Sequence, residues 1–386
     1  MRKFYTAEAV TEGHPDKLCD QIADAILDVC LKNDENSRVA CEVLATKGNI
    51  IVAGEITSAY EPDVFAVVRK VLSDVGYSSE GIAMDTFVHR QSPDIAGAVD
   101  TSKERREGVS DNQIDWFQGA GDQGVMIGYA CDETKQLMPM PVVLANRIVR
   151  ELSACRQSSY IQGILPDGKA QVTVEYENGK PVRLDSVVVS CQHKEEKDLK
   201  KLEAEIRKKV LLPALRPLPP DEETKIYINP SGRFVCGGLD ADTGLTGRKL
   251  MVDSYGSMVP HGGGAFAGKD CSKVDRSAAY MARYIAKNIV AAGLASKCQV
   301  SLAYAIGVAQ PVMVQVDTFG TGNVCADDCL ELAIPLVFGL TPKQIVDSLR
   351  LTRPIFRQTA AFGHFGRKEF PWERTDKVEA LRNAVI

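Results

Sequence analysis

Residues 261–280 read HGGGAFAGKDCSKVDRSAAY, a run of three glycines followed by basic residues and then by an apolar periodicity. The glycines, Gly262–Gly264, allow backbone N–H groups to approach an anion closely, and the lysines that follow add positive charge nearby. From Asp275 to Ala292 the apolar residues recur at helical spacing, which predicts a helix. A glycine loop that leads into a helix N-terminus favours anions, so the stretch predicts a polyphosphate site.

Part of this stretch also matches the Walker A pattern of P-loop nucleotidases. The match begins at Gly263, but Asp270 stands where the pattern requires Ser or Thr for magnesium. Pro260 precedes the loop, where a P-loop needs a buried strand. A P-loop kinase or ATPase is therefore disfavoured, and a glycine-rich turn with a solvated basic rim remains the alternative to a phosphate site.

The composition indicates a globular protein of more than one domain. The chain has 386 residues, 45% of them hydrophobic, and a formal net charge of −5. This acidic balance argues against nucleic acid or a membrane surface as a partner, and no apolar run approaches the roughly 20 residues of a membrane span. The 11 cysteines form no CxxC or CxxH pair, and residues 1–10 lack the apolar region of a signal peptide. These features predict a cytoplasmic protein with reduced thiols.

The order strand, helix, hairpin, helix repeats three times along the chain. We expect an α+β fold of three similar domains related by pseudo-threefold symmetry, with helices on one face of each sheet. The predicted domains are 1–100 (N-terminal), 116–229 (middle) and 230–386 (C-terminal, with the glycine loop), and the charged, aperiodic residues 101–115 predict a mobile lid loop. The expected elements are strands over 4–10, 124–130 and 249–254; hairpins over 39–57, 170–189 and 300–318; and helices over 16–32, 62–75, 141–157, 195–212, 275–292 and from 326.

The first predicted helix follows the motif TEGHPDK and carries an aspartate at every fourth position. Residues with this spacing share one helix face, and for Asp20, Asp24 and Asp28 we expect that face to be solvated. Asp16 lies in the first turn, where it either compensates the helix dipole or holds magnesium. His14 either caps the helix or meets an anion.

The hairpin over 39–57 carries two glutamates that are expected to face each other. A type II′ turn at Gly48-Asn49 pairs residue 47 with residue 50, and therefore Glu42 with Glu55. Directly opposed carboxylates repel, and the neighbouring residues on that face supply no cation. We therefore expect a positive partner from outside the hairpin: a metal ion, an ammonium group or another chain. A register shift by one residue would instead separate the two glutamates.

Other glycine-rich segments display charged or aromatic residues. GAGDQG matches the dinucleotide pattern GxGxxG, but a strand-like segment follows it, which excludes a Rossmann site and leaves a tight turn that displays Asp122. NPSGRFVCGG offers Arg233 and Phe234, whose ring is suited to stacking on a base. Because DADTGLTGRK adds Arg248 and Lys249 upstream of the glycine loop, these segments together predict a site for a nucleoside triphosphate with magnesium.

TEGHPDK, GAGDQG, GLTGRK and HGGGAFAGKDxxKVDRSAAY together resemble the S-adenosylmethionine synthetase (methionine adenosyltransferase) family. The resemblance continues through TAAFGHFGR and FPWE and so covers nearly the whole chain. It implies three similar domains and a homodimer with shared active sites, either alone or as a dimer of dimers (a homotetramer). The implied reaction belongs to one-carbon metabolism: methionine sulfur attacks C5′ of ATP, and the released triphosphate is hydrolysed to pyrophosphate and phosphate.

The resemblance also implies roles for residues that match the family motifs. Asp16 and Asp275 would hold two magnesium ions per site and Glu42 a potassium ion, although Asp275 also completes a predicted capping box with Ser272. The implied catalytic residues are His14, Lys169, Arg248, Lys249, Lys269 and Lys273. The implied ATP contacts are His14, Asp122, Asp167, Gly168, Lys169, Arg233, Phe234, Asp242, Arg248, Lys249, Ala265 and Lys269. The implied methionine contacts are Glu55, Gln91, Asp242, Lys273 and Ile306.

Two departures from the family pattern fall on either side of QSPDIA. The segment 81–90 is shorter than the family usually has, and the charged stretch 101–112 is longer, so no residue from 101 to 115 receives a role. A non-catalytic regulatory subunit of the same fold is the alternative to an active enzyme. Such a subunit is expected to have lost phosphate or metal residues, whereas every matched position here carries suitable chemistry.

Overall fold

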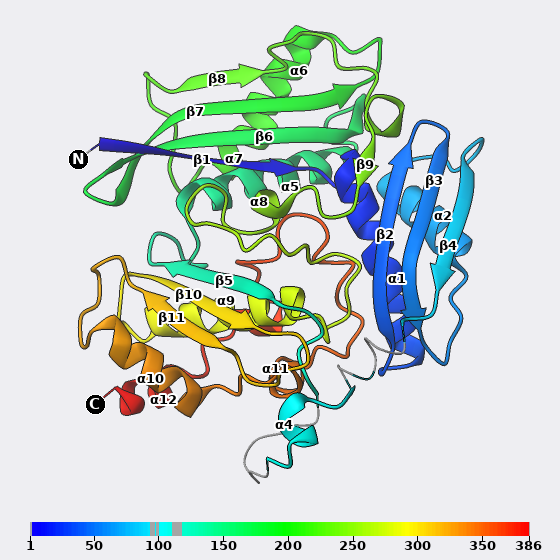
Figure 1. The fold of residues 1–386 in the computed structure, drawn as a ribbon. Coiled ribbons are helices and arrows are strands. Elements are labelled where there is room, and N and C mark those ends of the chain that lie inside the picture. Colours follow the sequence, from blue (N-terminus) through cyan, green and yellow to red (C-terminus); the bar gives the residue numbers. More distant parts are fainter. Residues whose placement is uncertain (1, 93–96, 98–99, 110–117, 386) are drawn as a thin grey trace.

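The computed structural model describes residues 2–92, 97, 100–109 and 118–385, which form three β-sheets (Figure 1). Their strand orders are β1-β6-β7-β8, β11-β10-β5 and β4-β3-β2-β9. The strands are β1 Arg2–Val10, β2 Arg38–Thr46, β3 Asn49–Thr57, β4 Ala83–His89, β5 Gly124–Cys131, β6 Ile164–Glu177, β7 Lys180–His193, β8 Lys225–Ile228, β9 Gly244–Leu245, β10 Lys297–Tyr304 and β11 Met313–Asp317. The predicted α+β class is confirmed.

Each sheet combines a hairpin with a strand donated by a distant part of the chain. β1 comes from the N-terminal third but pairs with β6, β5 comes from the middle third but pairs with β10, and β9 comes from the C-terminal third but pairs with β2. The three thirds therefore exchange one strand each in a cycle, which is the arrangement that a pseudo-threefold relation produces. Every sheet contains strands from both sides of a predicted domain boundary. The boundaries therefore divide the sequence but not the sheets, and they stay predictions.

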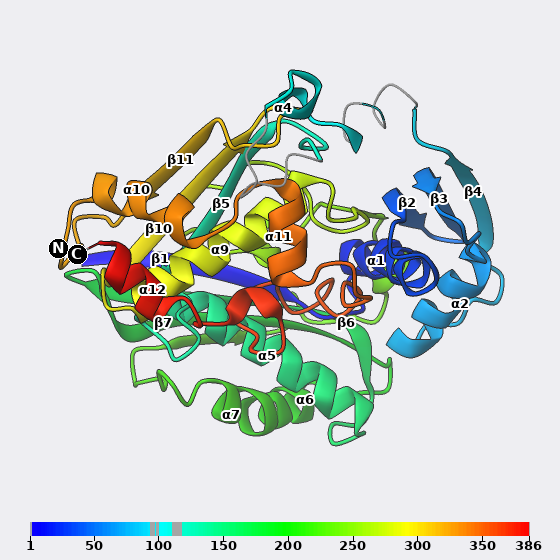
Figure 2. The ribbon, with the colours of Figure 1, turned by 90° about the horizontal axis from the view of Figure 1, so that it is seen from below.

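A long helix covers one face of each sheet. α1 (Pro15–Asn33) packs on β2 and β9, α5 (Met140–Gln157) on β6 and β1, and α9 (Val274–Ala291) on β10 and β5. Each helix thus contacts both its own hairpin and the donated strand, and Figure 2 shows α9 near the centre with α11 beside it. The other helices that can be given bounds in the described part of the chain are α2 Val64–Val75, α4 Lys103–Arg106, α6 Leu199–Ile206, the π-helix η1 Arg207–Leu211, α7 Leu212–Ala214, η2 Gly238–Asp240, α8 Leu250–Asp253, α10 Asp327–Val337, α11 Pro342–Leu349, η3 Pro371–Glu373 and α12 Val378–Ala384.

The predicted strand over 249–254 is wrong. This segment forms the helical turn α8, and the strand that the C-terminal third donates lies earlier, at β9. A short apolar run fits a strand or a helix equally well, and a tertiary contact decides here: the Lys17 ammonium lies 2.5 Å from the carboxylate of Asp253. The predicted capping box at the start of α9 is also wrong, because Lys273 is the N-cap residue and makes no side-chain cap.

The hairpin of β2 and β3 has a different register from the one predicted. Lys47 and Gly48 form the turn, with Gly48 at φ 73°, so that Thr46 pairs with Asn49. Glu42 therefore pairs with Ala53, and Glu55 with Ala40. The register differs from the predicted one by two residues, which keeps both glutamates on one face as diagonal neighbours instead of opposing them directly.

The aspartate face of α1 is not solvated, so that prediction is wrong. Asp20 and Asp24 are 0% exposed, and the four residues Asp16, Asp20, Asp24 and Asp28 form what we call the aspartate row. Each carboxylate of the row accepts backbone N–H groups from the C-terminal third of the chain. The donors are Leu245 to Asp16 (3.0 Å), Gly247 to Asp20 (2.9 Å), Gly268 to Asp24 (2.8 Å), and both Phe356 and Arg357 to Asp28 (2.9 Å each).

The segment predicted as a lid, 101–115, is described only as far as residue 109, and residues 110–115 lie outside the described part of the chain. Its described part contains α4 and contacts the loop after β10. The carboxylate of Glu104 accepts the N–H groups of Ala309 (2.9 Å) and Gln310 (3.2 Å), and the Lys103 N–H donates to the carbonyl of Gly307 (2.8 Å).

The eleven cysteines are all free thiols, as predicted. Among the described residues, no single helix is long and apolar enough to cross a membrane. The helices α10 and α11 are long and apolar enough only when they are counted as one segment, and the chain bends by 75° between them.

Asp24 is the member of the row with the strongest charge partner. The guanidinium of Arg276, on α9, donates to both of its carboxylate oxygens at 2.7 Å, and both side chains are 0% exposed. We predict that Asp24→Asn destabilises the protein by about 3–5 kcal/mol, because it leaves a buried guanidinium without its counter-charge. Denaturant unfolding measures the loss. Asp347→Asn is the control: it removes the exposed Lys343 pair and is expected to cost less than about 1 kcal/mol. Equal losses in the two variants would contradict the prediction.

Candidate active site

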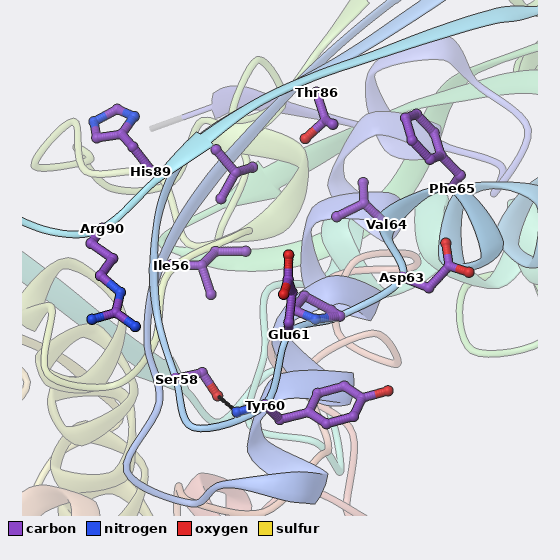
Figure 3. Close-up of a pocket in the computed structure, with 12 residues that line it drawn as sticks. Ile56, Ser58, Tyr60, Glu61, Asp63, Val64, Phe65, Thr86, His89 and Arg90 are labelled. Carbon is purple, nitrogen blue, oxygen red and sulfur yellow. Dashed lines mark hydrogen bonds between the residues drawn. The ribbon is translucent and has the colours of Figure 1, made fainter.

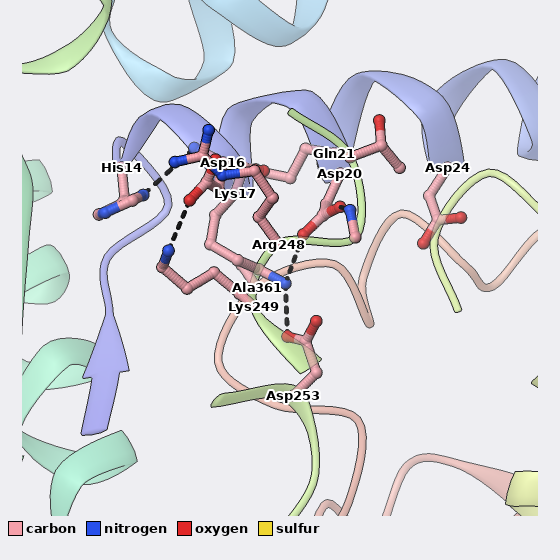
Figure 4. Close-up of polar contacts among 12 residues, drawn as sticks. His14, Asp16, Lys17, Asp20, Gln21, Asp24, Arg248, Lys249, Asp253 and Ala361 are labelled. Atoms are coloured by element: carbon pink, nitrogen blue, oxygen red, sulfur yellow. Dashed lines mark hydrogen bonds and ion pairs between the residues drawn. The ribbon is translucent and has the colours of Figure 1, made fainter. Parts of the chain in front are cut away.

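The first part of the site surrounds the N-terminus of α1 (Figure 4). Asp16 is 1% exposed, and its carboxylate meets the Lys249 ammonium at 2.5 Å and the Arg248 guanidinium at 3.2 Å. Burial alone raises the pKa of this carboxyl, but the hydrogen bonds from Lys249 and Leu245 and the charge of Arg248 outweigh it, so that the net pKa is lowered. Asp16 is therefore ionised at neutral pH. The same contacts bring the GLTGRK segment against the TEGHPDK segment.

His14 is the N-cap residue of α1, and its Nδ1 accepts the backbone N–H of Asp16 at 3.2 Å. Burial, together with the charge of Lys249, lowers the pKa of His14 to about 4. The imidazole is thus neutral at physiological pH, and because Nδ1 accepts, Nε2 carries the hydrogen. The capping interpretation of His14 is confirmed, and its contact with an anion stays a prediction.

The start of β6 brings a second segment to this cluster. The charges of Lys169, Lys249 and Asp242 all influence the pKa of His14, so two distant segments, 167–169 and 242–249, lie near its imidazole. Lys169 is half-exposed and lies 2.8 Å from the carboxylate of Glu8. Asp167 is buried, which raises its pKa, and it accepts the N–H of Gly238 at 2.9 Å.

The glycine loop is the second part of the site. A Cβ on Gly262 would lie 1.6 Å from the carbonyl oxygen of Val125, and a Cβ on Gly264 would lie 2.2 Å from a carboxylate oxygen of Asp275. Glycine is therefore required at both positions for close approach, and Gly263 has a φ of 100° that other residues rarely adopt. The space that Gly264 leaves open is lined by the Asp275 carboxylate.

Two lysines beyond the glycines are each paired with an aspartate. The Lys269 ammonium lies 2.6 Å from Asp275, and the Lys273 ammonium lies 2.5 Å from Asp270. Asp270 is 2% exposed and also accepts the backbone N–H groups of Val39 (2.7 Å) and Ser272 (2.9 Å). Asp270 therefore has a structural role at the position where Walker A needs a hydroxyl, and the segment before the loop is no strand, so the P-loop alternative is excluded.

The two glutamates of the first hairpin find positive or donor partners within the same chain. Burial raises the pKa of Glu42, as do Asp20 and Glu55, whereas the charge of Lys269 opposes this shift. Glu55 lies 3.1 Å from Nε2 of His89, at the end of β4. For Glu42, the Lys269 ammonium is a positive partner from outside the hairpin, as predicted. A metal ion or a substrate ammonium group at these glutamates stays a prediction.

The remaining predicted site residues lie at the edges of these two parts. Asp122 is exposed on its turn, and Ile306, 45% exposed, pairs with Ala120 of the same GAGDQG segment. The Gln91 N–H donates to the hydroxyl of Thr57 at 3.1 Å. Arg233 forms an exposed pair with Glu195 at 2.7 Å, and Phe234 is half-buried beside the end of β7.

Models of the S-adenosylmethionine synthetase domains match this chain along almost its whole length. The N-terminal domain matches residues 2–99, the central domain residues 117–234 and the C-terminal domain residues 236–374. The chain belongs to the S-adenosylmethionine synthetase family. Its activity is that of a methionine adenosyltransferase, which binds ATP and methionine as substrates and uses metal ions.

The carboxylates of the synthetase site fit a hard divalent cation. Among the described residues, no three His, Cys, Asp or Glu side chains gather into a metal cluster. Mg²⁺ usually takes one or two carboxylates and completes its shell with substrate phosphates and water. Asp16, which is ionised, and Asp275, which lines the gap left by Gly264, are donors of this kind.

A cavity of about 490 Å³ lies apart from the synthetase site (Figure 3). It opens between the ends of β3 and β4 and the start of α2, where Ile56, Val64 and Phe65 line it. Successive strand residues point to opposite faces, so Ile56 faces this cavity while Glu55 points away from it. Of the predicted site residues and their partners, only His89 borders the cavity.

The glycine loop gives a prediction that separates function from stability. Gly264→Ala places a Cβ against the carboxylate of Asp275, and we expect this displacement to lower turnover about a hundredfold while the protein stays folded. Steady-state kinetics and circular dichroism measure the two effects. Gly48→Ala, which strains a hairpin turn with no atom within 4 Å, is the matched control and is expected to keep full activity. A fully active Gly264→Ala variant would contradict the role of this gap.

Proposed function

We propose that this synthetase joins methionine and ATP at a site built from the N-terminus of α1, the 167–169 segment, Arg248-Lys249 and the glycine loop. The observation that carries the proposal is the convergence of two distant segments on the start of α1: β6 brings Lys169 opposite Val10, and Lys249 pairs with Asp16. The sulfur of methionine is already a good nucleophile, so no general base is needed. The difficulty of the reaction is the departure of a highly charged triphosphate, and stabilising it requires cations and N–H donors.

Each residue of the proposed site has a separate task. The neutral His14 donates Nε2–H toward the leaving 5′ oxygen, while Arg248, Lys249 and Lys269 balance the charge of the phosphates. One cation about 4 Å from an anionic oxygen contributes on the order of 4 kcal/mol at an effective dielectric near 20, so several cations supply a large part of the stabilisation. Glu55, Gln91 and Ile306 hold methionine in line with C5′, which lowers the entropic part of the barrier.

The metals proposed for the site are two Mg²⁺ ions and one K⁺ ion. Asp16 and Asp275 would hold Mg²⁺, and Glu42, on the same sheet face as Glu55, would hold K⁺. When bound, these ions supply charge neutralisation at the triphosphate.

The proposed phosphate lysines and metal carboxylates are already paired with one another. Lys249 pairs with Asp16, and Lys269 pairs with Asp275. For a lysine to meet phosphate, its carboxylate needs another cation, since an uncompensated carboxylate beside a triphosphate is repulsive. Binding of nucleotide and of divalent cation is therefore coupled at this site.

Two properties of the assembly extend the proposal. The family resemblance supports a homodimer with shared active sites, alone or as a dimer of dimers. The eleven free thiols favour the cytoplasm as its location.

Product analysis tests the proposed reaction. Purified protein with ATP, L-methionine, Mg²⁺ and K⁺ is expected to form S-adenosylmethionine, pyrophosphate and phosphate in equal amounts, and to form none of them when methionine is left out. Formation of ADP and phosphate without methionine would overturn the proposal in favour of an ATPase. Binding of ATP with no product would instead support the regulatory-subunit alternative.

Lys269 gives the sharpest test of a single residue. We predict that Lys269→Ala lowers kcat about a hundredfold or more, because the ammonium acts on charge that develops at the leaving group, while the KM for methionine changes much less. Lys70→Ala, which removes an exposed ammonium on α2, is the matched control and is expected to leave both constants unchanged. Unchanged turnover in Lys269→Ala would rule out its assigned role.

A further inference from the structure

Two buried side chains at the end of β7 hold the segment that carries Arg233 and Phe234, and the proposed reaction gives neither of them a task. They are Gln192, 6% exposed, and His193, 2% exposed. The segment from 229 to 237 that they contact has no helix or strand of its own. Its backbone N–H and C=O groups therefore need partners from elsewhere in the fold.

His193 binds both backbone groups of Phe234. The His193 N–H donates to the Phe234 carbonyl at 2.9 Å, and the Phe234 N–H donates to Nε2 of the His193 ring at 3.1 Å. Because Nε2 must accept, the hydrogen of the neutral ring lies on Nδ1, which donates to the carbonyl of Lys194 at 2.8 Å. The orientation and tautomer of the ring are thus set from both sides.

Gln192 links the same segment to β6. Its Nε2 donates to the carbonyl of Val235 at 3.0 Å, and its Oε1 accepts the N–H of Asp167 at 3.3 Å. Gly237 lies directly on the Gln192 side chain, since a Cβ there would be 2.6 Å from the amide carbon. The Asp167 carboxylate makes a second link between the two segments by accepting the N–H of Gly238 at 2.9 Å. One side chain therefore couples the 167–169 segment to the Phe234 segment.

The ring of Phe234 has little other support. Phe234 is half-buried, and it belongs to neither of the two apolar clusters that form the core of the described chain. Its position is therefore set through its backbone, by the hydrogen bonds of His193 and Gln192, and not through packing of its ring.

We propose that His193 and Gln192 are positioning residues for the adenosine half of ATP, which fix Phe234 relative to Asp167 before the nucleotide binds. The inference rests on the proposed function, in which Phe234 borders the adenosine. The cations proposed to balance the triphosphate, Arg248, Lys249 and Lys269, lie on other segments. A defect at His193 or Gln192 is therefore expected to affect substrates that carry adenosine and to spare a substrate that is triphosphate alone.

The experiment compares two reactions of the same enzyme: synthesis from ATP and methionine, and hydrolysis of inorganic tripolyphosphate. His193→Leu and Gln192→Met are expected to raise the KM for ATP about tenfold, the effect of losing buried hydrogen bonds. The KM for methionine and the rate of tripolyphosphate hydrolysis should stay within about twofold of the unmodified protein. His193→Gln is expected to recover most of the ATP affinity, because its amide oxygen can accept the Phe234 N–H.

Lys194→Ala is the matched control, since the side chain of Lys194 is exposed and only its carbonyl takes part. Unchanged KM for ATP in both test variants would overturn the inference, and so would an equal loss of synthesis and tripolyphosphate hydrolysis, which indicates a general structural defect. If circular dichroism shows that His193→Leu does not fold, Gln192→Met decides by the same criteria. Failure of the unmodified protein to catalyse either reaction would overturn the proposed function itself, and the inference with it.

Discussion

The aspartate row on one face of α1, in which three of the four side chains are buried, is the constraint on which the rest of the structure depends. A buried carboxylate is costly unless hydrogen bonds and charge satisfy it, and α1 presents this row to a surface supplied by the C-terminal third. Two of the donors are glycine N–H groups, at Gly247 and Gly268, and each stands within two residues of a lysine of the synthetase site. The aspartate row thereby places Lys249 and Lys269, and the same contacts that stabilise the fold set the positions of two cations of the proposed site.

The exchange of strands makes this dependence mutual. β9 pairs with β2 for only two residues, yet it lies in the segment that leads from Asp242 to Arg248, and α1 packs against it. The N-terminal third is therefore completed by the C-terminal third, just as β1 completes the middle sheet and β5 the C-terminal one. Contacts between residues more than 200 positions apart, such as Asp24 with Gly268, hold the site together, and loop closure of that length makes them slow to form.

The sequence predicted most elements and the segments of the site, because periodicity and glycine-rich motifs are local signals. The predictions were wrong where contacts with residues distant in the sequence determine which side chains are buried. The spacing of Asp20, Asp24 and Asp28 shows that they share a face, but not that Gly247, Gly268 and Phe356 cover it. The hairpin register was ambiguous, since a two-residue turn fits Lys47-Gly48 as well as Gly48-Asn49. Gln192 and His193 carry no motif and end an ordinary strand, so only the structure reveals what they hold.

The two lysines after the glycine loop differ in what keeps them in place, and this difference separates their roles. Asp270 accepts two backbone N–H groups besides Lys273, so it remains anionic and buried whatever ligand is present, and Lys273 is a fixed cation. Within the described residues, the Asp275 carboxylate accepts a hydrogen bond only from the Lys269 ammonium. Its other oxygen faces the gap at Gly264. The Lys269 pair can therefore exchange partners at little structural cost. Of the two lysines, Lys269 is therefore the one that we propose to balance the charge of the triphosphate as it leaves.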